Sequence, residues 1–132
     1  MLKKLLSSVG IGAAKVDTQL TKTNFIVGEK LEGIVLIQGG QVDQEIDSIY
    51  LSLFTEFEDE IDDKKITRTA VIEKFELLHA FTISANETKE IPFSFMIPYV
   101  TPATLGKTNV WVQTGLDIKM AVDPQDRDYI KI

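Results

Sequence analysis

The sequence predicts an all-β domain, built as a two-sheet antiparallel β-sandwich. Two observations lead to this prediction: apolar, β-branched and aromatic residues recur with a period of two after Lys15, and turn residues separate these runs. We expect eight or nine strands, spaced as in sandwiches and barrels of antiparallel sheets. No repeat or internal linker interrupts the pattern, so residues 1–132 are expected to form a single domain.

A short helix is expected before the first strand. Leu2, Leu5, Leu6 and Val9 occupy the i, i+3, i+4 and i+7 positions of one helical face. Two turns are marginal in isolation, so a helix at residues 2–9 needs a surface to dock on, and we expect that surface to be the sandwich. The alternative is a membrane-surface helix, but such helices usually carry more basic residues and a bulky aromatic.

The first strands follow from alternation and from glycine. A strand is expected at residues 15–21, and β-branched residues dominate residues 33–37. The pair Gly39-Gly40 then predicts a two-residue hairpin to the next run, because glycine accepts positive φ angles. That next strand is long, and its alternation places three aliphatic residues on one face: Ile49, Leu51 and Leu53.

An acidic stretch from Glu56 to Asp63 precedes Lys64 and Lys65. Like charges repel and stay in water, so we interpret this stretch as a solvated hairpin tip. Two alternatives are a docking patch for a basic partner and a weak calcium site, although the ligand spacing and central glycine of an EF-hand are missing.

The second half of the chain continues the strand pattern. Strands are expected at residues 66–75, around Phe81 and Ile83, at 91–95, at 110–114, within 116–122, and around Tyr129 and Ile130. Proline has no N–H to donate, so Pro92 predicts that its strand lies at or beside a sheet edge. Trp111 is expected to pack in the core or in an interface, because it buries a large apolar area.

Composition excludes several classes of function. The chain has no cysteine, so it has no disulfide, zinc–thiolate site or thiol nucleophile, and this favours the cytoplasm. Its net charge of −6 and its two arginines argue against a nucleic-acid partner. No apolar run approaches the roughly 18–20 residues that cross a bilayer, and glycines and serines interrupt the segment where a signal peptide would lie.

Catalytic and metal-binding residues are sparse. His79 is the only histidine, and a surface or half-buried structural role is expected for it. No glycine-rich phosphate loop opens a helix, so no cofactor is expected. The one carboxylate set that could serve a metal-dependent enzyme or a metal-binding domain comprises Asp117, Asp123, Asp126 and Asp128.

The segment from Asp123 to Asp128 has two further interpretations. Asp123 before Pro124 is a turn initiator. Arg127 lies between Asp126 and Asp128, which predicts either a local structural ion pair or a latch that holds a second domain in place.

Two stretches resemble the amino-terminal domain of the arrestin-like superfamily. Residues 25–37 read FIVGEKLEGIVLI, and residues 90–102 read EIPFSFMIPYVTP. Within that superfamily, four further stretches resemble the bacterial sporulation-control protein family: KKLLSSVGIGAAKVD at 3–17, IDSIYLSL at 46–53, TGLDIK at 114–119 and VDPQDRDYI at 122–130. The resemblance covers nearly the whole chain.

This resemblance implies an arrestin-like (immunoglobulin-like) sandwich and a regulatory, non-catalytic protein of early sporulation in the cytoplasm. Members of the family are longer, so residues 1–132 would be the first of two sandwiches, with the second domain as one partner. Arrestins recognise phosphorylated receptor tails through basic residues. Lys15 and Lys22 lie near the first strand, but no equivalent basic cluster is recognisable, so the phosphate-sensing role does not transfer.

Other protein partners are expected to bind at strand edges. A two-sheet sandwich has four edges, and an edge strand offers unpaired N–H and C=O groups to any extended segment. The strand at residues 15–21 and the strand around Phe93 are the candidates, and they would pair with a second copy of the chain or with a partner's segment. The competing hypotheses are the metal-dependent enzyme and a peripheral membrane adaptor that uses the N-terminal helix.

Overall fold

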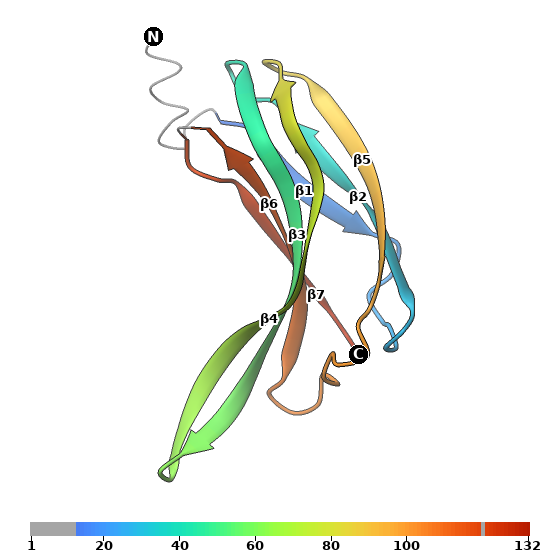
Figure 1. Ribbon diagram of the computed structural model, residues 1–132, viewed down its shortest axis with the longest axis vertical. Helices are drawn as coiled ribbons and strands as arrows, with labels where there is room; N and C mark the ends of the chain where they lie inside the picture. The colour runs from blue at the N-terminus through green and yellow to red at the C-terminus, as the bar shows by residue number, and fades with distance from the viewer. Residues whose placement is uncertain (1–12, 120) are drawn as a thin grey trace.

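The computed structural model describes residues 13–119 and 121–132, and these residues form seven strands in two antiparallel sheets (Figure 1). One sheet has the order β1–β2–β5 and the other has the order β4–β3–β6–β7. The strands are β1 (Lys15–Leu20), β2 (Lys30–Gln38), β3 (Gln44–Ile61), β4 (Lys64–Ile83), β5 (Thr88–Met96), β6 (Asn109–Ile118) and β7 (Gln125–Ile130).

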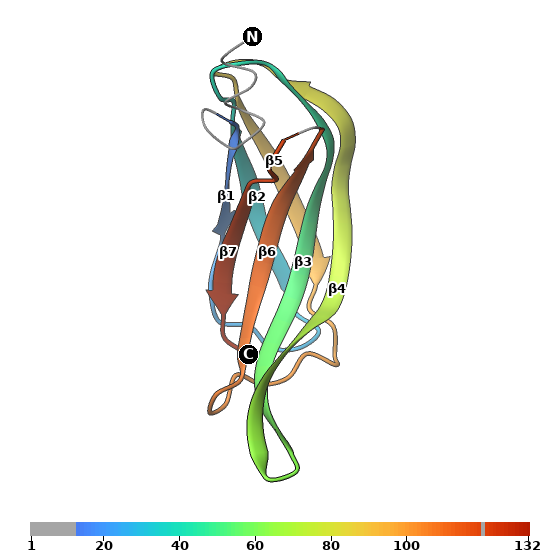
Figure 2. The same cartoon turned by 90° about the vertical axis from the view of Figure 1, so that its left-hand side faces the viewer.

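The two sheets lie face to face (Figure 2), which confirms the predicted all-β, two-sheet sandwich. Alternation along the strands supplies the core, and the predicted inward face of β3 is confirmed, because Ile49, Leu51 and Leu53 are fully buried. The helix expected at residues 2–9 lies outside the described residues, so it stays a prediction, as does its membrane-surface alternative.

Two predicted strand breaks are wrong. β4 runs without interruption from Lys64 to Ile83, where two strands were expected, and β6 is likewise one strand. The pairing of β3 with β4 shifts register between Ile49 and Tyr50 and again between Leu53 and Phe54. Such bulges bend a strand and change its side-chain pattern without ending it, so the sequence pattern looks broken where the strand is continuous.

The hairpin predicted at Gly39-Gly40 is also wrong. β2 and β3 belong to different sheets, so this connection crosses from one layer to the other. The Gly39 N–H donates to the Glu87 carbonyl at 2.6 Å, and the Asn86 N–H donates to the Gly40 carbonyl at 3.0 Å. A Cβ at Gly39 would lie 2.1 Å from the Ser84 carbonyl oxygen. Glycine is therefore needed here for close packing of two connections rather than for a tight turn.

Candidate functional site

A polar seam joins β1 of one sheet to β7 of the other. Asp126 and Asp128 alternate along β7 with Arg127, and their register partners on β6 are the buried Thr114 and Val112. Both carboxylates therefore lie on the inner side of the four-stranded sheet. The Thr18 N–H on β1 donates to Asp126 Oδ2 at 2.8 Å, and this hydrogen bond crosses between the layers. The Thr18 and Thr114 hydroxyls form a second hydrogen bond across the seam.

Asp128 has the most perturbed carboxyl of this seam. Its Oδ2 atom is buried and has no hydrogen-bond partner among the described residues. Burial, then the neighbouring Asp126 carboxyl with its charge, and then the charge of Asp17 raise the pKa of Asp128 from 3.8 to about 7. A proton is therefore retained in the seam at pH values where an exposed aspartate is fully ionised.

This pKa predicts that stability depends on pH. The folded-state pKa of Asp128 exceeds the unfolded value, so the native state binds more protons between about pH 4 and pH 7, and the free energy of unfolding falls as pH rises through that window. An asparagine side chain at this position would donate to Asp126 without ionising. We expect Asp128→Asn to stabilise the domain at pH 8 by about 1 kcal/mol, below the full value of the shift because water screens a half-exposed group.

Urea unfolding at pH 4.5 and pH 8 measures this effect. Asp128→Asn should raise the free energy of unfolding at pH 8 and should hardly change it at pH 4.5, where the wild-type carboxyl is protonated. Asp117→Asn, on the outer face of β6 opposite Ser48, is the control and should show no such difference. Equal effects of Asp128→Asn at the two pH values would contradict the assignment.

Arg127 points away from this seam. Its guanidinium lies 4.3 Å from the ring centroid of Trp111, and its Nη1 donates to the Tyr129 hydroxyl at 3.3 Å. Among the ion pairs of residues 13–119 and 121–132, none includes Arg127. The predicted local ion pair with Asp126 and Asp128 is wrong, because adjacent strand residues lie on opposite faces of the sheet. The latch that would hold a second domain in place stays a prediction.

The four aspartates proposed as a metal set do not converge. Asp117 lies on the outer face of β6, and Asp126 with Asp128 lies on the inner face of β7. Asp123 Oδ1 accepts the Ile118 N–H at 3.0 Å, which confirms its role in the turn. Within the described part of the chain, no group of three or more His, Cys, Asp or Glu residues is arranged to hold a metal ion.

Lys15 and Lys22 lie near opposite ends of β1 and do not form one basic site. Lys15 is the first residue of that strand and is exposed. Lys22 donates to the Glu29 carboxylate and lies 5.1 Å from the Phe25 ring centroid. The hydrogen bond from Lys22 lowers the pKa of Glu29. Lys22 is thus engaged in a local contact with the β1–β2 connection.

The acidic stretch is the tip of the β3–β4 hairpin, as predicted. Asp62 and Asp63 form the turn with φ angles of 51° and 62°. Glu58 lies 3.1 Å from Lys107 Nζ, and a hydrogen bond from this lysine lowers the pKa of Glu58. His79, on the same hairpin, is highly exposed, which confirms the surface role expected for it.

Both predicted edge strands are edges. β1 and β5 flank β2 in the three-stranded sheet, and Pro92 lies within β5. The Thr18 N–H faces away from β2, so one donor on the free edge of β1 is already bound to Asp126. The free edge of β5 lacks a donor at Pro92. Neither edge offers an unbroken row of backbone donors.

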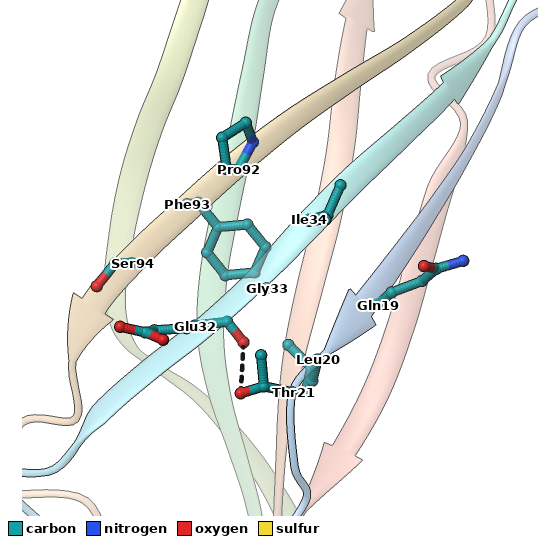
Figure 3. Close-up of a pocket in the computed structure, with 9 residues that line it drawn as sticks. All are labelled: Gln19, Leu20, Thr21, Glu32, Gly33, Ile34, Pro92, Phe93 and Ser94. Carbon is teal, nitrogen blue, oxygen red and sulfur yellow. Dashed lines mark hydrogen bonds between the residues drawn. The ribbon is translucent and has the colours of Figure 1, made fainter.

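A groove lies on the three-stranded sheet, and sequence reasoning missed it (Figure 3). It is an open depression with a volume of about 620 Å³, and it is lined by Gln19, Leu20, Thr21, Glu32, Gly33, Ile34, Pro92, Phe93 and Ser94. A Cβ at Gly33 would lie 2.5 Å from the Gln19 carbonyl oxygen and 2.8 Å from the Phe93 ring. A glycine inside a strand often marks such a close approach, and this was the available signal.

No helix in the described residues is long and apolar enough to cross a membrane.

Comparison with known proteins shows several matches. A family model described as SpoOM protein matches residues 2–132. The sporulation-control protein spo0M of Bacillus subtilis (strain 168) is 43% identical over 128 residues, which are 97% of this chain and 50% of that protein.

Solved structures agree with these matches. The crystal structure of Spo0M from Bacillus subtilis superposes with a TM-score of 0.88 at 41% identity, covering 92% of this chain and 49% of that one. The alkylpurine DNA glycosylase AlkC of Pseudomonas fluorescens gives a TM-score of 0.50 at 12% identity, over 95% of this chain and 33% of that one, and this shows a likeness of fold alone. This chain spans about half the length of its Bacillus relative.

Proposed function

This chain belongs to the SpoOM protein family, and we propose that it is a non-catalytic regulator of early sporulation that acts in the cytoplasm as an arrestin-like scaffold for other proteins. The name of the Bacillus relative, a sporulation-control protein, supports a role in sporulation. The groove on the three-stranded sheet supports the mode of action.

The groove has the composition of a protein-binding surface. Ile34 and Pro92 lie opposite each other on neighbouring strands and form an apolar centre. Ile34 is 38% exposed although it is a large aliphatic residue in the middle of a sheet. Polar side chains of Gln19, Glu32 and Ser94 surround this centre. An apolar centre with a polar rim is the usual anatomy of a protein interface, so a partner's extended segment would fit here.

The apolar end of the sandwich supports a second domain as a further partner. The four most exposed large apolar side chains of the described residues are Ile26, Tyr99, Val100 and Leu105. The loops that carry them are joined to the last residues of the chain, where the Phe25 N–H donates to the Lys131 carbonyl at 2.8 Å and the Thr104 N–H donates to the Ile132 carbonyl at 3.2 Å. We propose that this surface packs against a second sandwich in longer proteins of the family.

Complementation tests the regulatory proposal. A Bacillus subtilis strain that lacks the 43%-identical relative would receive this chain fused to the remaining half of that relative, and heat-resistant spores would be counted. We expect the fusion to restore sporulation and Ile34→Asp to lower the spore count at least tenfold, because a charge would replace the apolar centre of the groove.

Val122→Asp is the matched control, because Val122 is 56% exposed and lies outside the groove. Both variants should melt at the wild-type temperature. The proposal fails if Ile34→Asp supports sporulation as well as Val122→Asp does, or if the fusion restores no sporulation although the chain is folded.

A further inference from the structure

The groove on the three-stranded sheet (Figure 3) has an apolar centre made of side chains that point away from the core. Along β2, Val35 is fully buried, so its neighbours Ile34 and Leu36 point to the opposite, outer side of the sheet. Ile34 lies opposite Pro92 of β5. Leu36 is the next outward residue of β2, so the apolar surface continues beyond the groove as a strip along this strand.

Two carboxylates flank this apolar strip. The register places Asp17 of β1 and Glu90 of β5 on either side of Leu36. Both residues are exposed, and none of the ion pairs that the structure describes includes either of them. Their negative charges are therefore available to a partner.

A third carboxylate lies at the other end of the strip. Glu32 is the outward residue of β2 on the far side of Ile34, and it lines the groove. Its ion-pair partner is Lys30, whose Nζ lies 3.9 Å from Glu32 Oε1, and both side chains are more than half exposed. Such an exposed pair is weak, because water screens it. The apolar strip thus has carboxylates at both of its ends.

The lysines of this outer face lie away from the strip. Lys15 is opposite Gln38 and Lys30 is opposite Met96, and these two pairs mark the two ends of β2. Between them, the outward positions of the three described strands hold three carboxylates and no lysine or arginine. The middle of the face is therefore both apolar and negatively charged.

This combination favours a positively charged occupant. Lysine and arginine have long apolar stems, so their side chains can cover an apolar strip while the charged groups reach carboxylates at its ends. Hydrogen bonds between such cations and carboxylates are stronger than those between neutral groups. A second copy of the chain that docked by the same face would bring these carboxylates toward their own copies, so repulsion opposes self-association here.

We propose that the groove binds an extended segment of a partner protein in which lysine or arginine residues flank a large apolar side chain. The apolar side chain would lie against Ile34 and Pro92. The basic residues would reach Glu32 at one end of the strip and Asp17 with Glu90 at the other. This inference rests on the proposed function, because it assigns a chemistry to the partner of the same groove.

Peptide selection tests the charge of the preferred segment. A phage-displayed library of random ten-residue peptides would be panned against the immobilised chain. We expect the selected peptides to be enriched in lysine and arginine by about threefold or more over the unselected library, because the face is negatively charged. A neutralised variant should lose this enrichment, and it carries Asp17→Asn, Glu32→Gln and Glu90→Gln.

The matched control removes the same number of charges from the other sheet. Its three carboxylates are exposed and belong to none of the described ion pairs, and its substitutions are Glu60→Gln, Glu73→Gln and Asp117→Asn. The control should select basic peptides as the natural chain does. Both variants should melt at the wild-type temperature.

Fluorescence anisotropy of the most enriched peptide provides the second measurement. The neutralised variant should bind it about tenfold or more weakly than the natural chain, and the control within about twofold, because the lost charges lie far from the groove. Raising the NaCl concentration from about 50 to 500 mM should also weaken binding to the natural chain, because salt screens exposed charges.

Selected peptides without a basic excess would overturn this inference, as would equal binding by the neutralised variant and the control, or a chain that selects no peptide. None of these results changes the spore count of Ile34→Asp, which tests whether the groove serves the regulatory function. The proposed function is therefore decided separately, by that count.

Discussion

Replacing Trp111 by alanine is expected to lower the free energy of unfolding by about 3–5 kcal/mol, although this side chain lies outside the core between the sheets. Trp111 is only 2% exposed, on the outer face of β6. Phe54 stacks on it with ring centroids 5.5 Å apart, Tyr129 lies 5.6 Å away, and the Arg127 guanidinium covers it at 4.3 Å. Its removal would leave a cavity and expose its neighbours, because none of them can fill the space of an indole.

Urea unfolding monitored by circular dichroism measures this change. Tyr129→Ala is the matched control, because Tyr129 belongs to the same aromatic group but is 55% exposed, so its loss should cost much less. A cost for Trp111→Ala no larger than that for Tyr129→Ala would show that the outer cluster contributes little to stability.

Gly39→Ala is expected to destabilise the domain by about 3 kcal/mol, the upper end of the range for overpacked sites. The new Cβ would lie 2.1 Å from the Ser84 carbonyl oxygen and 3.1 Å from the Asn86 nitrogen. Both are backbone atoms of the β4–β5 connection, so no side-chain rotation relieves the contact. The two connections would have to separate, and the hydrogen bond from the Gly39 N–H to Glu87 would lengthen or break.

Gly106→Ala separates crowding from backbone strain. Gly106 has a φ of +58° and no atom within 4 Å of its missing Cβ, so alanine there should cost only about 1 kcal/mol for the left-handed conformation. The melting temperatures of the two variants measure which substitution destabilises the domain more. A smaller loss for Gly39→Ala than for Gly106→Ala would contradict the close-packing role of Gly39.

The predictable features of this fold are those that depend on neighbouring residues. Period-two alternation identified the buried face of Ile49, Leu51 and Leu53, because a strand turns successive side chains to opposite sides. Pro92 identified an edge strand through its missing N–H. The charges between Glu56 and Asp63 identified a hairpin tip through their mutual repulsion.

The features that escaped prediction depend on segments distant in sequence. The pair Gly39-Gly40 predicted a turn. The actual reason for glycine at position 39 is the Ser84 carbonyl that crowds it, and this residue lies far along the chain, after β3 and β4, where no local pattern reveals the contact. The groove needs β1, β2 and β5 side by side, and no local pattern specifies that order. The orientation of Arg127 is a different case. Its separation from Asp126 and Asp128 follows from alternation once β7 is recognised as a strand through these residues.

The polar seam makes the two long sides of the sandwich unlike each other. Along the β1–β7 side, the layers are joined by the Thr18–Asp126 hydrogen bond next to a carboxyl that titrates near neutral pH. Along the β4–β5 side they meet through aromatic packing, where the Phe75 and Phe95 rings stack with centroids 4.6 Å apart. We therefore expect a rise in pH to weaken the contact between the layers along the β1–β7 side and to have no direct effect on the Phe75–Phe95 contact, which contains no ionisable group.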